Sequence, residues 1–546
     1  MEKESVASGK IMGDENSIKV TKDVKNNAEA DTMKCKENRM RDIISNGLQE
    51  QMKEIMQDVL ELVNNRMNNM VSEILQKVDK MASNELKDLV DSETYCNRTK
   101  KMREDTLPSK QFLQRNSLLT DLYEIKHIRA IYNFSLAALI VLIIHTTVHD
   151  IRNTGSPNFA IDTIKASFAK LSVVFYIWSL MKISTLGIYV AFCYWATNRL
   201  EYVPRSFTRK LWDYIWLGVL ILYHIVFCVL PAKAVVDHDL PLASSMIVLM
   251  EQVRMIMKTY AFVRSVAPRF LSYKPHSEIP APKSPDFSNF LYFMFAPTLI
   301  YQDSYPRSKK IHWNIVVTNF AEVVTIVFFV AFIHERLIYP LYRDFGKEPI
   351  EMGMVYMNIL NSILPGLLMF LCAFYCLFHC WMNAFAELLR FADKMFYKDW
   401  WTSISYSAYY RTWNIVVHDW LYTYIYKDMY EILTPGNRKL SMCGVFAISA
   451  IFHEYIICFS IRFFYPVMLI LFGVIGVAAA FLLKRAGNLF FLFSLSVGSG
   501  LLVSLYCMEY FARVNCPPYR KDFWDYVIPR TWTCIIHRNE TEDTTV

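Results

Sequence analysis

The hydrophobic and polar positions divide this sequence into a polar N-terminal part and an apolar remainder. Apolar residues are sparse up to Asp121, and the first long apolar run begins near Ile131. Such runs then recur at lengths of about 18 to 26 residues, enough to cross ~30 Å of hydrocarbon. The fourth run contains Glu251, Arg254 and Lys258, which makes it the weakest candidate. We expect nine membrane spans, near 131–148, 171–195, 211–236, 241–263, 311–332, 355–382, 440–459, 463–483 and 489–506.

The composition agrees with a membrane protein and excludes other classes. Of the 546 residues, 53% are hydrophobic and 15% aromatic, with only 16 glycines. Abundant Tyr, Phe and Trp are typical of chain at a membrane interface. This balance excludes a disordered, collagenous or small disulfide-stapled protein. The net charge of +7 is modest and its cations lie beside apolar runs, so we expect membrane lipid and no nucleic acid as a partner.

The distribution of Lys and Arg between the loops predicts the orientation. Cations are plentiful in the loops after the second, fourth and eighth expected spans, and poorer after the third and fifth. Cytoplasmic loops carry an excess of Lys and Arg. We therefore expect a cytosolic N-terminus and a lumenal C-terminus in the endoplasmic reticulum membrane. Residues 1–110 are polar and show no cleavable signal.

The cysteines fit this orientation. Cys516 and Cys534 flank the segment after the last span, on the side that permits disulfides, and we expect them to pair. Asn539 begins a glycosylation sequon on the same side, whereas the sequon at Asn97 would be cytosolic. The other ten cysteines form no CxxC pair, so we expect no metal site.

Three regions follow from these patterns: a cytosolic region over 1–110, a transmembrane domain over 111–510 and a lumenal tail over 511–546. Residues 1–41 are charged and predicted to be disordered. Between about 48 and 90 apolar residues recur in steps of three and four, which predicts a helix with a coiled-coil-like seam. The seam is a candidate for self-association, or else packs on its own protein or on the membrane surface. Over 112–131 we expect an amphipathic helix along the cytosolic interface.

Ionisable residues inside the spans are the first place to look for chemistry, because they are costly there unless they face a cavity or a partner. Four histidines in or at the ends of spans are more simply structural: His145, His224, His334 and His379. His453 differs, because it lies well inside an apolar span beside Glu454. A neutral imidazole there keeps a lone pair that could remove a proton from a hydroxyl group.

Aromatic and polar residues also gather in the long stretch between the sixth and seventh spans. Residues 396–401 read FYKDWW, 409–414 read YYRTWN and 418–422 read HDWLY. Rings together with Lys, Arg and His could stack a nucleobase and hold phosphates. An aromatic belt at the headgroup level explains the Trp and Tyr, but it explains the Asn, His and Asp less well.

These residues resemble the membrane-bound O-acyltransferase family, and its sterol O-acyltransferase branch in particular. FYKDWW at 396–401 is similar to the family's FYxDWWN element, His453 matches the family histidine, and Asn414 matches the asparagine 39 positions before it. The sterol branch is favoured by LIYQDSYP at 299–306, HDW at 418–420 and PRTWTC at 529–534. The resemblance runs from about Phe112 to Cys534.

The resemblance implies an all-α polytopic bundle of about nine transmembrane helices around a central chamber, assembled as a homo-oligomer. It implies transfer of a long-chain acyl group from acyl-CoA, a substrate and not a cofactor, to the 3-hydroxyl of a sterol. His453 would act as general base and Asn414 would bind the thioester carbonyl. The residues expected to bind acyl-CoA are Phe396, Tyr397, Asp399, Trp400, Trp401, Tyr409, Arg411, Trp413, His418, Tyr426, Arg438 and Ser449.

Thr402 departs from the family pattern, because the FYxDWWN element ends in asparagine at that position. If the position braces the acyl-CoA loop, activity or chain-length preference is altered here. A diacylglycerol acyltransferase remains an alternative, since the same two residues would serve a glyceride hydroxyl. A transporter is disfavoured because the spans show no internal repeat, and a lipid-binding scaffold remains the other non-enzyme alternative.

Overall fold

The computed structural model describes residues 110–274, 280–347, 350–518, 522–531 and 534, together with Met56, Glu61, Arg66 and Ser72. The chain divides into two units, Met1–Leu107 and Pro108–Val546, and every element below belongs to the second. Apart from four isolated positions, the expected seam over 48–90 lies outside the described residues. So do both sequons.

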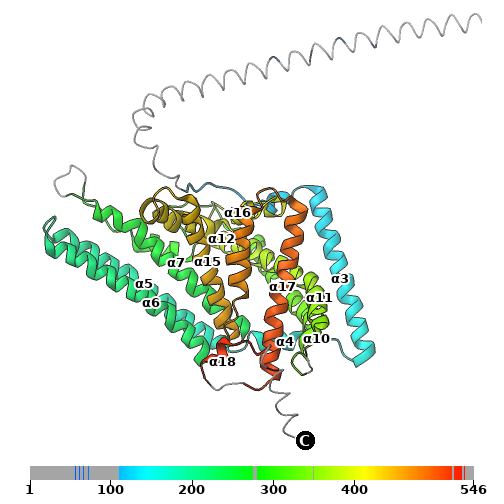
Figure 1. Cartoon of the computed structure of the whole chain (residues 1–546). Helices are drawn as coiled ribbons and strands as arrows, with labels where there is room; N and C mark the ends of the chain where they lie inside the picture. The colour runs from blue at the N-terminus through cyan, green and yellow to red at the C-terminus, as the bar shows by residue number, and fades with distance from the viewer. Residues whose placement is uncertain are drawn as a thin grey trace, which may run out of the picture. The chain divides into compact units, whose positions relative to one another are not determined.

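All the named elements of the described chain are helices, as expected (Figure 1). The α-helices are α2 (Leu118–Leu122), α3 (Lys126–Thr154), α4 (Ile161–Ser167), α5 (Leu171–Glu201), α6 (Phe207–Asp237), α7 (Leu242–Leu271), α8 (Phe287–Phe295), α9 (Trp313–Ile333), α10 (Tyr339–Tyr342), α11 (Met352–Phe374), α12 (Met382–Leu388), α13 (Tyr406–Thr412), α14 (Ile415–Trp420), α15 (Arg438–Ile461), α16 (Val477–Leu482), α17 (Asn488–Asn515) and α18 (Trp524–Val527). The π-helical segments are η1 (His334–Ile338), η2 (Tyr375–Trp381), η4 (Leu421–Tyr426), η5 (Met429–Leu433) and η6 (Leu469–Gly476), and η3 (Trp400–Thr402) is a 3₁₀ turn.

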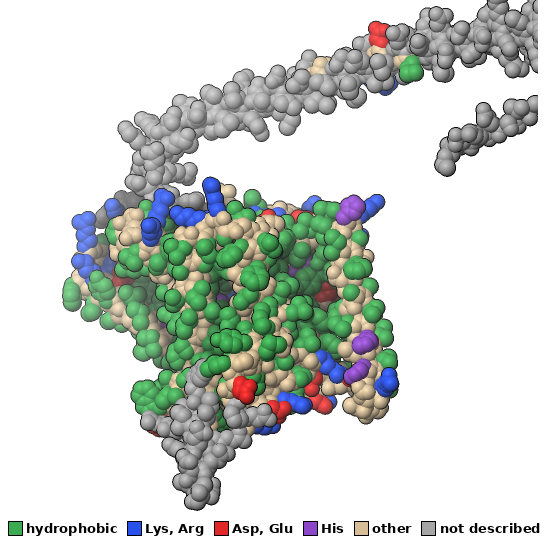
Figure 2. Space-filling model, turned by 45° about the vertical axis from the view of Figure 1, so that its right-hand side comes forward, with side chains coloured by type: hydrophobic (Ala, Val, Ile, Leu, Met, Phe, Trp, Pro, Cys, Tyr) green, Lys and Arg blue, Asp and Glu red, His purple; other side chains and the backbone are tan. Residues whose placement is uncertain are grey.

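Seven helical stretches of the described chain are long and apolar enough to cross a membrane. They are Lys126–Thr154, Ile161–Glu201, Phe207–Asp237, Trp313–Tyr342, Met352–Leu388, Arg438–Ile461 and Asn488–Asn515. The other two expected spans are helical as well, but α7 carries charges and the apolar helix Leu469–Leu482 is shorter. The face drawn in Figure 2 shows a broad apolar band, with Lys and Arg side chains along its upper edge. These observations confirm an all-helical polytopic membrane protein.

The charges of α7 are paired with neighbouring elements. Glu251 accepts from Arg254 at 2.5 Å and lies 2.8 Å from the Lys182 ammonium of α5. Lys258 is buried and donates to the carbonyls of Phe293 and Ala296 at the end of α8. Cations are favourable at the carbonyl end of a helix. These residues therefore make α7 a buried partner of α5 and α8.

Two glycines allow α11 and α17 to approach closely. A Cβ atom added at Gly500 would lie 2.6 Å from the Ile363 Cα atom, and one at Gly366 would lie 2.9 Å from the Ser499 carbonyl oxygen. Small residues at such contacts are typical of helices packed in membranes. By contrast, α3 stands at the edge of the bundle in Figure 1, and none of its most apolar stretch is buried.

The prediction of an amphipathic helix over 112–131 is wrong. Residues 110–116 are extended, α2 spans only Leu118–Leu122, and α3 begins at Lys126. The reason is tertiary: the Arg115 amide donates to the Ala392 carbonyl, and the Lys394 amide donates to the Arg115 carbonyl, both at 3.0 Å. The Phe112 ring packs edge-on against Tyr305 and Phe391. We call residues 110–116 the N-terminal strap.

At the other end of the described chain, Cys516 and Cys534 form a disulfide with a Cα–Cα distance of 6.1 Å. Nearby Glu509 is fully buried in α17 and accepts hydrogen bonds from Arg513 and from Thr531. This carboxylate fixes the segment that follows the last long helix.

Candidate functional site

The FYKDWW segment and the segment that begins at Tyr409 are held side by side by backbone hydrogen bonds. The Lys398 amide donates to the Thr412 carbonyl at 2.8 Å, and the Ile415 amide donates to the Phe396 carbonyl at 2.9 Å. These bonds place the loop around η3 against α13 and the start of α14. Two stretches that the sequence marked separately thus form one structural unit.

Four predicted acyl-CoA residues are buried, and we call them the aromatic core: Phe396, Tyr397, Trp400 and Tyr409. The Trp400 ring lies 4.9 Å from Trp413 and 5.2 Å from Phe374 of α11. Burial raises the pKa of both the Tyr397 and the Tyr409 hydroxyl. Because their side chains expose so little surface, these rings form the packed wall behind the site.

The other predicted residues keep accessible surface to different degrees. Asp399, Arg411, Arg438 and His453 are exposed, whereas Trp401, Trp413, Asn414, His418, Tyr426 and Ser449 are half-buried. In the described part of the chain no hydrogen bond or ion pair holds the side chains of Arg411 and Arg438. Their positive charges are therefore available to an anionic ligand.

His453 is held in one orientation by its own helix. Its Nδ1 atom lies 2.7 Å from the Ser449 carbonyl oxygen, one turn earlier in α15. A carbonyl oxygen can only accept, so Nδ1 carries the hydrogen and Nε2 of the neutral ring keeps its lone pair. The ring lies 5.2 Å from the Phe472 ring of η6. The side chain retains accessible surface although it lies within an apolar helix.

Asn414 is the N-cap of α14. Its side-chain Oδ1 atom accepts from the Val417 amide at 3.1 Å. This bond occupies the acceptor of the amide and leaves the Nδ2 hydrogens to donate elsewhere. No hydrogen bond joins Asn414 to His453 among the described residues, but η4, which continues α14, packs against α15.

An aromatic ladder continues from α14 into η4 and η5. The rings of His418, Tyr422, Tyr426 and Tyr430 are nearly parallel, with successive centroids 6.4, 5.6 and 5.9 Å apart. The Lys427 ammonium lies 5.5 Å from the centre of the Tyr422 ring. The predicted residues His418 and Tyr426 thus belong to one face. No hydrogen bond or ring contact links Arg438 to them in the described chain.

Thr402 braces the loop although it replaces the family asparagine. Its hydroxyl donates to the Asp399 backbone carbonyl at 2.7 Å and lies 3.0 Å from the Asp399 carboxylate. The contacts close the 3₁₀ turn η3. The effect of Thr402 on activity or chain-length preference stays a prediction.

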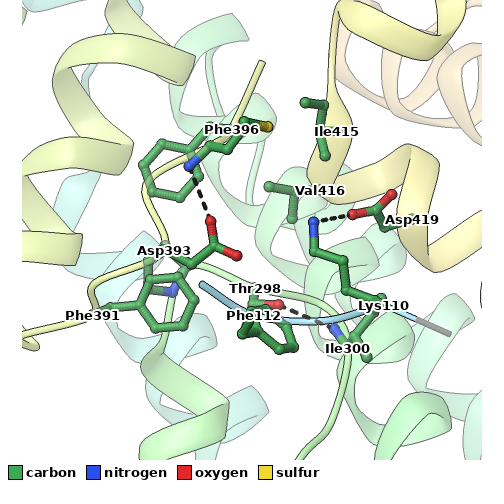
Figure 3. Close-up of a pocket in the computed structure, with 12 residues that line it drawn as sticks. Lys110, Phe112, Thr298, Ile300, Phe391, Asp393, Phe396, Ile415, Val416 and Asp419 are labelled. Carbon is green, nitrogen blue, oxygen red and sulfur yellow. Dashed lines mark hydrogen bonds and ion pairs between the residues drawn. The ribbon is translucent and has the colours of Figure 1, made fainter. Parts of the chain in front are cut away.

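Sequence reasoning missed the pocket drawn in Figure 3, which lies under the N-terminal strap. It is lined by Lys110, Phe112, Pro297, Thr298, Ile300, Phe391, Asp393, Met395, Phe396, Ile415, Val416 and Asp419. Lys110 contacts Asp419 there at 2.6 Å. Nothing in the pattern of a polar N-terminal segment signals such a contact 309 residues away.

Residues 242–508 match the family model described as MBOAT, the membrane-bound O-acyltransferase family. Sterol O-acyltransferase 2 of Homo sapiens is 41% identical over 434 residues, which are 78% of this chain and 80% of that protein. The chain belongs to the membrane-bound O-acyltransferase family.

Two further relatives show a similar level of identity over a similar share of the chain. Sterol O-acyltransferase 2 of Mus musculus is 42% identical over 78% of this chain and 81% of its own length. Sterol O-acyltransferase 1 of Rattus norvegicus is 40% identical over 80% of this chain and 81% of its own. The resemblance drawn from the FYKDWW, Asn414 and His453 motifs is confirmed at the level of the family.

Proposed function

We propose that this protein transfers a long-chain fatty acyl group from acyl-coenzyme A to the 3-hydroxyl of a sterol, giving a steryl ester and free coenzyme A. The observation that carries the proposal is the similarity to sterol O-acyltransferases, at 40 to 42% identity over 78 to 80% of the chain. The chain also has a histidine inside a membrane helix, His453, whose Nε2 atom is left as an acceptor.

In this mechanism His453 is the general base. Its Nε2 atom takes the proton of the sterol hydroxyl while the hydroxyl oxygen attacks the thioester carbonyl carbon. The carbon–sulfur bond then breaks, and the proton returns from the imidazolium to the departing thiolate. The hydrogen bond from Nδ1 to the Ser449 carbonyl supports this role, because it fixes the tautomer before substrate arrives.

Asn414 donates from Nδ2 to the thioester carbonyl, whose oxygen becomes negative during attack. One such donor is worth about 3 kcal/mol in comparable sites. The free charges of Arg411 and Arg438 and the ladder that begins at His418 bind the phosphates and the adenine of coenzyme A. The thioester is already activated, so the mechanism uses acyl-CoA as substrate and requires no cofactor.

The reaction joins a water-soluble polyanion to an apolar alcohol. We place the coenzyme A side of the site in the cytosol and the sterol side in the endoplasmic reticulum bilayer, with a cytosolic N-terminus and a lumenal C-terminus. Lys and Arg side chains gather along the upper edge of the apolar band, whereas those at the lower edge lie among Asp and Glu side chains (Figure 2), and this difference supports the orientation. We also infer that the protein works as a homo-oligomer.

An acceptor panel tests the proposal. The purified protein in nanodiscs receives labelled oleoyl-CoA with cholesterol, a plant sterol or diacylglycerol, and lipid products and free coenzyme A are both measured. We expect steryl ester and stoichiometric coenzyme A only with a sterol. Triacylglycerol as the main product would assign the protein to the diacylglycerol branch. Intact thioester with every acceptor would favour a binding scaffold or a transporter.

A further inference from the structure

The N-terminal strap is fastened by two ion pairs that reach different parts of the site. Arg115 donates to the two oxygens of the buried Asp393 carboxylate at 2.6 and 3.2 Å, next to the paired backbones. Lys110, at the other end of the strap, donates to Asp419 Oδ2 at 2.6 Å. The first pair fixes the strap on the loop before FYKDWW, and the second reaches α14.

The second ion pair matters because of where Asp419 lies. Asp419 lies on α14, and its other oxygen, Oδ1, is 3.4 Å from Nδ1 of His418. Burial raises the pKa of this carboxyl, but hydrogen bonds from His418 and Lys110 outweigh burial and hold the pKa below its usual range. The carboxylate is therefore ionised and shared between the strap lysine and the first ring of the ladder.

The helix that Lys110 contacts is short and carries two residues of the proposed site. α14 spans only Ile415–Trp420, begins at the N-cap Asn414, and includes His418. A helix of this length has little stability of its own, so its position depends on tertiary contacts. Figure 3 shows Lys110 lying over the pocket and pointing to Asp419, with Ile415 and Val416 of the same helix lining the wall.

We propose that Lys110 is a positioning residue for acyl-CoA, acting through Asp419 to hold His418 and α14 in place for the coenzyme A end of the substrate. In this proposal Lys110 acts through Asp419 and does not contact the reacting atoms. This inference rests on the proposed function, because it names the substrate whose binding the strap controls. Under this proposal, the strap residues next to the membrane domain contribute to acyl-CoA recognition, a role that no sequence motif assigns to them.

Kinetics with each substrate varied in turn test the inference. For Lys110→Met we expect the KM for acyl-CoA to rise ~10-fold, as for loss of one partner of a partly buried ion pair, with kcat and the sterol dependence unchanged. Lys110→Arg keeps the charge and should stay within about twofold of the parent protein. Lys309→Met removes an exposed cation and should leave the KM for acyl-CoA unchanged.

A charge exchange makes the test independent of folding defects in one variant. Asp419→Lys alone should raise the KM for acyl-CoA, and adding Lys110→Asp should recover part of the loss, because the pair is restored with reversed charges. An unchanged KM in Lys110→Met, a fall in kcat alone, or no recovery in the exchange would overturn the inference. Failure of the parent protein to consume acyl-CoA with a sterol would instead overturn the proposed function.

Discussion

The aromatic core and the pair formed by His453 and Asn414 come from the same family pattern but have different surroundings. The core side chains are buried and belong to one hydrophobic cluster, in which Trp400 contacts Phe374 and Trp413. His453 is exposed and Asn414 half-buried, and a single local hydrogen bond holds each of them. In the proposed mechanism, one set therefore supplies shape, and the other offers polar atoms to the substrate.

This difference teaches that a dense motif does not by itself mark a contact surface. FYKDWW would be equally recognisable whether its rings stack on a ligand or on one another. In this protein burial separates the two cases, since a ring without accessible surface cannot bind coenzyme A directly. Substitutions should divide accordingly into those that remove chemistry from a folded protein and those that remove the fold.

The largest expected effect is that of His453→Ala. Removing the base should lower kcat ~10³-fold, within the range typical of general-base catalysis. The melting temperature in detergent should change little, because the imidazole makes one hydrogen bond to its own helix. Product formation and thermal unfolding are measured on the same preparation.

The matched control is His145→Ala, which removes an exposed histidine from the peripheral helix α3. Its activity should equal that of the parent protein. Retained turnover in His453→Ala would show that His453 is not the general base. Loss of activity in both variants would indicate an effect of the membrane environment rather than loss of the base.

The next largest effect is expected in the aromatic core. Trp400→Ala should destabilise the fold by about 3–5 kcal/mol, the usual range for truncating a large buried ring. Trp401→Ala, one residue later and half-buried, should cost clearly less. Thermal melting followed by light scattering measures both. Equal melting temperatures for the two variants would contradict the division between core and contact residues.

Much of the fold could be predicted from the sequence, because long apolar runs have few alternatives in a bilayer. The nine expected ranges all fall on helices, and α7, the only one with three charged residues inside the expected range, packs charges against α5 and α8. The short π-helical segments such as η4 and η6 could not be predicted, since they leave the hydrophobic pattern unchanged.

For the candidate site, sequence motifs select residues but not their arrangement. His453 and Asn414 were identified by motif, whereas their surroundings depend on Phe472 and on the backbone pairing between Phe396 and Ile415. The helix prediction for the strap was wrong for a related reason. Phe112 and its neighbours have an amphipathic pattern, yet contacts with Tyr305, Phe391 and Asp393 favour an extended backbone. Local propensity is weak against such tertiary contacts.

A smaller effect, in two separable parts, is expected at Asn414. Asn414→Ala should lower kcat ~10²-fold through loss of the amide donor and destabilise the protein by about 1 kcal/mol through loss of the N-cap. Asn414→Asp keeps a cap acceptor but lacks the donor, so it should lose activity at an unchanged melting temperature. Full activity in Asn414→Asp would show that Asn414 only caps α14.

The smallest effect is expected at Arg411, whose charge is exposed and held by no partner in the described chain. Arg411→Ala should raise the KM for acyl-CoA about fivefold, with kcat unchanged, since one charge-assisted contact to a phosphate is lost. The protein should melt at the same temperature, because no internal bond is broken. A screened phosphate contact should also weaken as salt rises.

Arg485→Ala is the matched control for this last prediction, because Arg485 is likewise exposed and follows α16. Its KM for acyl-CoA should match that of the parent protein at every salt concentration. The parent KM should rise between low and high salt, and the slope should be shallower in Arg411→Ala, which has one phosphate contact fewer to screen. Identical slopes in the parent protein and Arg411→Ala would remove Arg411 from the coenzyme A site and leave the ladder beginning at His418 as the main candidate.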